Sequence, residues 1–246
     1  MTTQQPLLEA VSIGKRFGGV VALDGVDLTV QPGERVGLIG PNGSGKSTLV
    51  NCLSGAGRSD KGTIRFNGRP IERLPAYQRT RLGIVRTFQI PLPFVSMTVL
   101  DNLTIPLRFA AAHHAAAKTA AIDIGRALRI LEDVGLRDKA DESSSGLTQV
   151  EMRKLELARA VAAHPKLLIA DETMAGLSYS EIDEILALLF KLNEQGIAII
   201  MIEHIMRAVT AFAQRAVVLV AGRKIADGAT DLVLSNAEVG RAYFGE

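Results

Sequence analysis

The chain has little cysteine, few aromatic residues and no long apolar run. Its single cysteine, Cys52, excludes a disulfide within the chain and fits a reducing compartment. No uncharged run reaches the roughly 18 residues that a membrane-spanning helix requires. The longest apolar stretches, such as 197–202, have the length of a strand, and residues 1–6 lack the basic and apolar regions of a signal peptide. We therefore expect a soluble protein, which can still dock on a membrane protein.

Charge of either sign is not in large excess. The 246 residues carry a formal net charge of +2, so we expect no nucleic-acid partner. Residues 58–86 are locally basic, and we interpret them as a solvated face near a docked membrane, with contact to anionic lipid or nucleic acid as the alternative. Apolar residues make up 47% of the chain, enough for the core of one large α/β domain or two small lobes.

A glycine-rich loop is the most informative feature that is present. Residues 40–48 (GPNGSGKST) match the phosphate-binding pattern G-x-x-x-x-G-K-[ST], between a predicted strand at 36–39 and a helix predicted to begin at Thr48. Glycines let backbone N–H groups turn toward phosphate oxygens, and the helix N-terminus adds positive charge. Lys46 is predicted to reach the terminal phosphates and Ser47 to bind Mg²⁺. The predicted nucleotide-binding residues of the loop are Gly40, Asn42, Gly43, Ser44, Gly45, Lys46, Ser47 and Thr48.

The second motif is an apolar segment followed by two acids. Residues 167–170 (LLIA) predict a buried strand, and Asp171 and Glu172 follow at its carboxyl end, where α/β sheets bind nucleotides. Asp171 is expected to hold Mg²⁺ through water, and Glu172 to polarise the water that attacks the γ-phosphate. Taken alone, the motif is equally compatible with a solvated pair of acids; its combination with the phosphate-binding loop favours the catalytic interpretation.

The rest of the chain alternates between strand and helix patterns. Residues 7–36 contain apolar runs separated by turn dipeptides and predict an antiparallel β region. From about 97 to 163 the pattern is helical, with Thr98 and Asp101 as candidate caps and an alanine-rich segment at 109–128. After this segment strands again alternate with helices, which indicates a parallel sheet covered on both faces.

The order of these motifs resembles that of the ATP-binding cassette (ABC) ATPases along nearly the whole chain. The resemblance implies one α/β ABC ATPase domain over residues 1–246. Its P-loop NTPase core, at about 1–92 and 160–246, is expected to have a parallel sheet flanked by helices and an N-terminal antiparallel β region. A helical subdomain is expected to be inserted at about 93–159.

Three further residues take roles from this resemblance. Gln89, in the segment RTFQ, matches the glutamine that touches Mg²⁺ and water and joins the two lobes. His204 matches the histidine that contacts the γ-phosphate, and Phe17 the aromatic residue that stacks on adenine. Each residue alone is also compatible with a loop, capping or core role. With ATP and Mg²⁺ as ligands, the resemblance implies catalytic roles for Lys46, Gln89, Glu172 and His204, and metal-binding roles for Ser47, Gln89 and Asp171.

The sequence departs from the family at its signature, Leu-Ser-Gly-Gly-Gln. Counting back from Ala158-Arg159-Ala160 places residues 147–151 (LTQVE) over the signature, so that Thr148 keeps a hydroxyl and both glycines are replaced. Thr148 and Glu151 form a capping-box pattern, so the helix N-terminus can still offer N–H groups, and Thr148 is a candidate nucleotide contact. Val150, however, opposes close backbone approach. A register that uses Ser145-Gly146 is the alternative and needs a two-residue insertion.

Several stretches are similar to the ATPase subunits of branched-chain amino-acid importers; they are 15–19, 22–26, 86–89, 97–102, 222–228, 237–239 and 242–245. The similarity implies an energy-coupling ATPase: MgATP closes a dimer of nucleotide-binding domains and hydrolysis resets it. Implied partners are a second ABC ATPase, two membrane permeases and, indirectly, a solute-binding protein, on the cytoplasmic face of the membrane. Because of its altered signature, we favour a heterodimer, in which the site that uses Thr148 is the weaker one.

Other functions stay open at this point. The chain also resembles ATPases of urea or amide importers and of lipopolysaccharide export, and no residue in it identifies a solute. A non-transport ABC protein, a nucleotide-binding pseudo-ATPase and a small-molecule kinase are less favoured alternatives.

Overall fold

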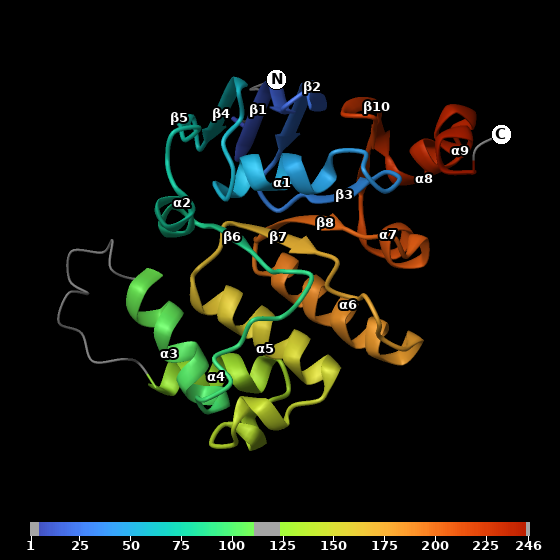
Figure 1. The fold of residues 1–246 in the computed structure, drawn as a ribbon. Coiled ribbons are helices and arrows are strands. Elements are labelled where there is room, and N and C mark those ends of the chain that lie inside the picture. The colour runs from blue at the N-terminus through green and yellow to red at the C-terminus, as the bar shows by residue number, and fades with distance from the viewer. Residues whose placement is uncertain (1–4, 111–123, 245–246) are drawn as a thin grey trace.

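The computed structural model describes residues 5–110 and 124–244 and contains two β-sheets with helices packed between and beneath them (Figure 1). The smaller sheet is antiparallel, with strand order β2-β1-β4-β5. Its strands are β1 (Leu8–Phe17), β2 (Val20–Val30), β4 (Lys61–Phe66) and β5 (Arg69–Pro70). Asn67 and Gly68 have φ values of 49° and 73°, as a two-residue type I′ turn requires. The predicted N-terminal antiparallel region is thus confirmed.

The larger sheet has six strands in the order β10-β9-β3-β8-β7-β6. They are β3 (Arg35–Ile39), β6 (Ile84–Arg86), β7 (Leu167–Asp171), β8 (Ala198–Ile202), β9 (Arg215–Val220) and β10 (Arg223–Ala229). All neighbours pair in parallel except β10, which is antiparallel to β9. Every residue of β7 and β8 is buried, as in a parallel sheet whose two faces are both covered.

Helices cover both faces of the larger sheet. One face packs on α1 (Lys46–Ser54), whose Leu49 and Leu53 share a core with apolar residues of both sheets. The opposite face is covered by α6 (Tyr179–Glu194) and α7 (Met206–Phe212) (Figure 1). The short helices α2 (Ala76–Leu82), α8 (Thr230–Leu234) and α9 (Ala237–Phe244) lie at the periphery.

The segment between β6 and β7 is helical and has an apolar core of its own. It contains α3 (Val99–Ala110), α4 (Ile124–Asp133) and α5 (Gln149–Ala162), with short 3₁₀ turns η2 (Arg137–Lys139) and η3 (Ser144–Gly146). Leu103, Leu131 and Leu155, one from each helix, are fully buried in this core. Thr98 caps α3, because its Oγ1 accepts the N–H of Asp101 at 3.0 Å, and Asp101 lies in the first turn. Most of the alanine-rich segment predicted as helix at 109–128 lies outside the described residues.

Two local expectations were wrong. Helix α1 begins at Lys46, two residues before Thr48, because Gly45 already caps it in the left-handed conformation (φ 104°). The basic stretch 58–86 is not wholly a solvated face. Arg79 is 1% exposed and donates to the carbonyl oxygens of Cys52 and Leu53, which satisfies groups left free at the end of α1.

Among the described residues, no helix combines the length and the apolar character needed to cross a membrane.

Candidate functional site

The glycine-rich loop between β3 and α1 contains two positions at which only glycine fits. A Cβ atom on Gly40 would lie 2.1 Å from the carbonyl oxygen of Leu219, and one on Gly45 would lie 2.6 Å from that of Ala22. These close approaches hold the loop against β9 and β2 at the N-terminus of α1. A loop of successive amides that leads into a helix N-terminus is the geometry that binds phosphate oxygens.

Lys46, the first residue of α1, is folded into this loop. It is 6% exposed, and its Nζ donates to the carbonyl oxygens of Gly40 at 2.7 Å and Pro41 at 2.9 Å. Burial lowers the pKa of Lys46, and the charges of Glu172 and Asp171 act in the opposite direction. Phosphate oxygens would replace these neutral acceptors by charged ones, which bind an ammonium group more strongly. The loop and Lys46 therefore fit a polyphosphate.

The remaining loop residues differ in exposure. Ser44 is buried, with its Oγ 3.5 Å from Lys46 Nζ, whereas Asn42, Gly43 and Ser47 are exposed and Thr48 is half-buried. Across residues 5–110 and 124–244, no three His, Cys, Asp or Glu side chains lie together as metal ligands. A Mg²⁺ ion that is also bound by a phosphate chain needs only one or two oxygen ligands from the protein. The hydroxyl of Ser47 and the carboxylate of Asp171 are oxygen ligands of this kind.

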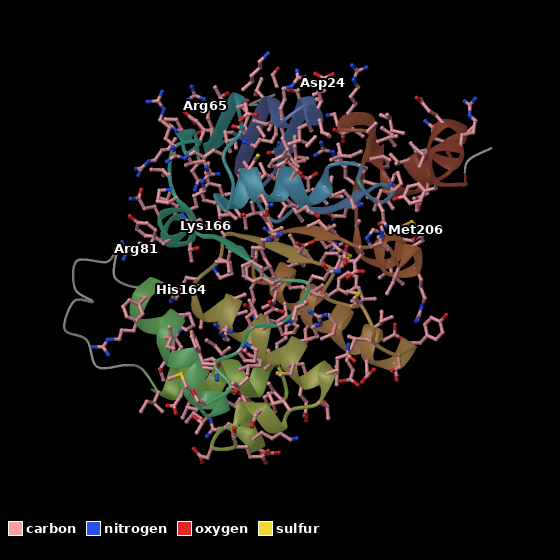
Figure 2. All side chains as sticks on the ribbon, in the orientation of Figure 1. Asp24, Arg65, Arg81, His164, Lys166 and Met206 are labelled. Atoms are coloured by element: carbon pink, nitrogen blue, oxygen red, sulfur yellow. The ribbon has the colours of Figure 1, made fainter. Side chains whose placement is uncertain are left out.

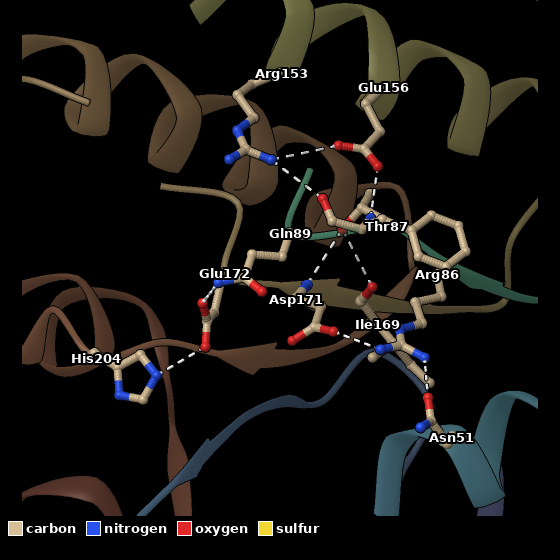
Figure 3. A network of polar contacts seen from close by, with 11 residues as sticks. Asn51, Arg86, Thr87, Gln89, Arg153, Glu156, Ile169, Asp171, Glu172 and His204 are labelled. Atoms are coloured by element: carbon tan, nitrogen blue, oxygen red, sulfur yellow. Dashed lines mark hydrogen bonds and ion pairs between the residues drawn. The ribbon is translucent and has the colours of Figure 1, made fainter. Parts of the chain in front are cut away.

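Asp171, at the carboxyl end of β7, is paired with an arginine from the neighbouring strand (Figure 3). Arg86 Nη2 donates to Asp171 Oδ2 at 2.6 Å. Arg86 Nη1 also donates to Asn51 Oδ1 of α1 at 2.6 Å. One guanidinium thus connects the expected metal ligand to the helix that follows the phosphate-binding loop.

Glu172 lies between two side chains that come from other segments (Figure 3). Gln89 Nε2 donates to Glu172 Oε2, and His204 Nε2 lies 2.8 Å from Glu172 Oε1. The φ of Glu172 is 47°, a left-handed conformation that costs a non-glycine residue roughly 1–2 kcal/mol. The structure therefore brings together three residues that the sequence predicted as catalytic, in a strained backbone conformation typical of functional sites.

Phe17 lies at the end of β1 with 58% of its surface exposed. It pairs with Val20 across the strand turn, and Lys15 Nζ lies 5.4 Å from the ring centroid. Ala22, which approaches Gly45, is on the same strand as Val20. An exposed aromatic face next to the phosphate-binding loop is compatible with stacking on a base.

The altered signature lies at the N-terminus of α5, and the predicted capping box is present there. Thr148 Oγ1 accepts the N–H of Glu151 at 3.4 Å, and Glu151 Oε2 accepts that of Thr148 at 2.9 Å. Lys139 Nζ lies 2.9 Å from Glu151 Oε1; this bond and the one from Thr148 lower the pKa of Glu151. Gln149 Nε2 donates to the carbonyl oxygen of Ala175 at 3.2 Å. Among the described residues, Thr148 hydrogen-bonds to Glu151 and, through its carbonyl oxygen, to the N–H of Met152 at 2.9 Å, both of α5 and neither in the phosphate-binding loop.

The sequence did not identify several polar residues around Gln89. Arg86 stands three residues before Gln89 but was given no role, and Asn51 carried no signal. Arg153 and Glu156, on α5, are both buried and bond to the backbone of Phe88. Two oppositely charged residues three positions apart on a predicted helix are typical of an ion pair on the helix surface. Only the folded chain therefore identifies Arg153 and Glu156 as part of the site.

Comparison with known proteins agrees with this geometry. The family model described as "ABC transporter" matches residues 23–175. The high-affinity branched-chain amino acid transport ATP-binding protein LivG of Escherichia coli K12 is 37% identical over 98% of this chain and 99% of its own. BraF of Pseudomonas aeruginosa, a transport ATP-binding protein of the same description, is 35% identical over 98% of this chain and 99% of its own.

A solved structure gives the same result for the fold. The ADP conformation of an ATP-binding cassette of an ABC transporter superposes with a TM-score of 0.87, at 33% identity over 99% of this chain and 100% of that one. Together, the family match, the full-length relatives and the arrangement around Glu172 establish that the chain belongs to the ABC transporter family and is one of its ATPase subunits.

Proposed function

We propose that this ATPase powers an importer of branched-chain amino acids. The relatives at 35–37% identity over nearly the full chain, which carry that name, support the solute class. The observation that supports hydrolysis most directly is the position of Glu172. Its carboxylate is held by Gln89 and His204, directly after Asp171 at the end of β7. A carboxylate oriented from both sides is suited to orient a water molecule for attack.

Each predicted site residue then has a defined task. Gly40, Asn42, Gly43, Ser44, Gly45 and Thr48 form the loop that holds the phosphates, and Phe17 stacks on adenine. Lys46 leaves the carbonyl oxygens of Gly40 and Pro41 for the terminal phosphates, and its charge stabilises the transferring group. Ser47, Asp171 and Gln89 hold Mg²⁺, which when bound neutralises phosphate charge. Glu172 orients the attacking water, and His204 supports the phosphoryl group.

We infer that the functional dimer is asymmetric. Each nucleotide is expected to lie between the loop of one subunit and the signature of the other. In this chain the N-terminus of α5, where phosphate would bind, already has a carboxylate, that of Glu151. Two anions at one helix terminus repel each other, and Val150 adds a branched side chain. A second, unlike ATPase with an intact signature would complete the site formed by Lys46 and Glu172, and the site that uses Thr148 would stay weak.

The expected membrane partner is a pair of permeases, to which the chain docks from the cytoplasmic side, with a solute-binding protein acting beyond them. A groove of about 520 Å³ supports a docking site; it lies between the core and the helical segment and is lined by Tyr77, Arg81, Phe88, Leu92, Phe109 and Glu156. Figure 2 labels Arg81, one of the residues that line this groove. We propose that residues 93–159, with their separate apolar core, form a subdomain that moves against a core of 1–92 and 160–246.

Steady-state ATP hydrolysis by the purified chain, alone and mixed with its candidate partner ATPase, tests this proposal. We expect hydrolysis in the mixture and little in the chain alone. Glu172→Gln should lower the rate about 100-fold or more while ATP binding persists, because Gln cannot accept a proton. Cooperative hydrolysis by the chain alone would contradict the asymmetric dimer, and unaffected hydrolysis by Glu172→Gln would contradict the role of Glu172.

A further inference from the structure

Gln89 lies on the chain segment that follows β6. The hydrogen bonds that join this segment to the larger sheet end at Thr87, two residues before Gln89. The N–H of Thr87 donates to the carbonyl oxygen of Ile169 at 3.0 Å, and Thr87 Oγ1 accepts the N–H of Asp171 at 3.2 Å. Thr87 is thereby fixed to β7. The direction of the chain beyond it, and so the approach of Gln89 to Glu172, depends on what holds the next residue, Phe88.

Two side chains of α5, Arg153 and Glu156, which are labelled in Figure 3, bond to both backbone groups of Phe88. The N–H of Phe88 donates to Glu156 Oε1 at 2.5 Å, and its carbonyl oxygen accepts from Arg153 Nη1 at 3.1 Å. Further along the segment, Arg159 Nη1 donates to the carbonyl oxygen of Leu92 at 2.6 Å. Arg153, Glu156 and Arg159, which we call the α5 stripe, are spaced three residues apart and so lie on one side of the helix.

The two bonds to Phe88 come from buried side chains, which makes them costly to lose. Arg153 is 4% and Glu156 8% exposed, and Glu156 Oε2 and Arg153 Nε have no hydrogen-bond partner among the described residues. Burial raises the pKa of Glu156. Arg153 Nη1 lies 3.8 Å from Glu156 Oε2 as an ion pair, and the N–H of Phe88 is the hydrogen-bond donor that the described residues give this carboxylate. Loss of that bond would leave a buried polar group unsatisfied.

We propose that the α5 stripe positions Gln89 against Glu172. Gln89 follows Phe88 directly, so a shift of α5 moves the backbone of Phe88 and with it the amide that orients the Glu172 carboxylate. The stripe residues touch no reacting atom; they act through Phe88 and are positioning residues. This inference rests on the proposed role of Glu172 in hydrolysis.

Two of the three residues of the α5 stripe line the groove. Glu156 and Arg159 line it together with Phe88 and Leu92, the residues whose backbone they hold. The hydrolysis site and the groove therefore share one wall, and whatever occupies the groove contacts the residues that set the position of Gln89.

Two substitutions at Glu156 separate positioning from packing. Glu156→Leu keeps the volume but removes the acceptor for Phe88, whereas Glu156→Gln keeps a carbonyl oxygen there. In the hydrolysing complex with the partner ATPase, we expect Glu156→Leu to lower kcat about tenfold with KM for ATP unchanged. We expect Glu156→Gln to stay within about twofold of the unsubstituted protein.

Glu184→Leu is the matched control. Glu184 pairs with Lys154 of α5 at 2.6 Å but does not contact Phe88, so kcat should be unchanged. The proposal is overturned if Glu156→Leu keeps its kcat, or if Glu156→Gln loses as much as Glu156→Leu. If Glu156→Leu does not fold by circular dichroism, Arg159→Met, at a half-buried position, is measured in its place and has to lower kcat without changing KM.

If Glu172 has no role in hydrolysis, the measurements give a different result. Unaffected hydrolysis by Glu172→Gln would refute the proposed function, and the α5 stripe is then tested on the chain alone by hydrogen–deuterium exchange of residues 86–95. Faster exchange of the Phe88 amide in Glu156→Leu, but not in Glu156→Gln, supports the contact. Equal exchange in both variants refutes it.

Discussion

At the scale of single residues, the Glu172 carboxylate determines the hydrogen-bonding roles of its two neighbours, Gln89 and His204. The Glu172 carboxylate can serve only as an acceptor when it is ionised, and the contact with His204 Nε2 then requires the tautomer that has its N–H at Nε2. Gln89 and His204 each take one acceptor site, and a carboxylate has about four, so two remain for water. Glu172 is therefore oriented without being saturated, which is what a group that positions a nucleophilic water needs.

Glu203, next to His204, gives a prediction about pH. Burial raises its pKa to about 7, and its Oε1 accepts the N–H of Met174 at 3.0 Å, with the charges of Glu172 and His204 nearby. Between pH 4.5 and about 7 the folded chain binds a proton that the unfolded chain has lost, so the free energy of unfolding should fall as pH rises through this range. The full effect is about 3 kcal/mol.

Glu203→Gln keeps the acceptor and removes the titration. Chemical denaturation of the nucleotide-free chain should show the variant gaining stability relative to the unsubstituted protein as pH rises from 5 to 8. Parallel curves for the two proteins would show that Glu203 ionises normally in the folded state.

At the scale of elements, the N-terminus of α5 decides whether the signature works. Restoring the family pattern with Gln149→Gly, Val150→Gly and Glu151→Gln removes the carboxylate and opens the helix terminus. We expect this variant alone to hydrolyse ATP at least about tenfold faster than the unsubstituted chain alone, because a homodimer would then have complete sites.

The capping box of α6 supplies the control for that experiment. Ser178 and Glu181 form the same pair of bonds as Thr148 and Glu151, so Glu181→Gln matches the Glu151→Gln part of that variant at another helix. It should leave hydrolysis unchanged and lower stability by about as much as Glu151→Gln does alone. A restored signature that gives no gain would mean that Glu151 does not limit the site.

Local patterns in the sequence predicted the elements well, and long-range contacts account for what was missed. The loop at 40–48, the acids after β7 and the capping box of α5 follow from residues close together in the chain, which is why they were predicted. The contact of Phe88 with Glu156 spans 68 positions. The buried Arg79 reaches carbonyl groups 26 and 27 positions away. Such pairs exist only after the helices and sheets have packed together.

At the scale of the whole molecule, the resemblance to the ABC family predicted the architecture that residue patterns alone left open. Composition allowed either one domain or two lobes. The structure has a two-sheet core and a helical segment with separate apolar interiors, and α5 contributes to both the segment core and the layer beneath the larger sheet. A helix shared in this way is well placed to carry movement between the two parts, as the α5 stripe requires.

The pairing of Arg86 with Asp171 has a practical consequence for handling the protein. The buried carboxylate that is expected to meet Mg²⁺ already has a cation from its own chain, so removal of divalent ions leaves no uncompensated charge. Thermal unfolding of the nucleotide-free chain should occur within about 1 °C in EDTA and in magnesium chloride. In Arg86→Met, by contrast, magnesium should raise the midpoint, because Asp171 then lacks its partner. We therefore expect a chain with this pairing to tolerate chelators throughout purification and storage, and to need magnesium only when nucleotide is added.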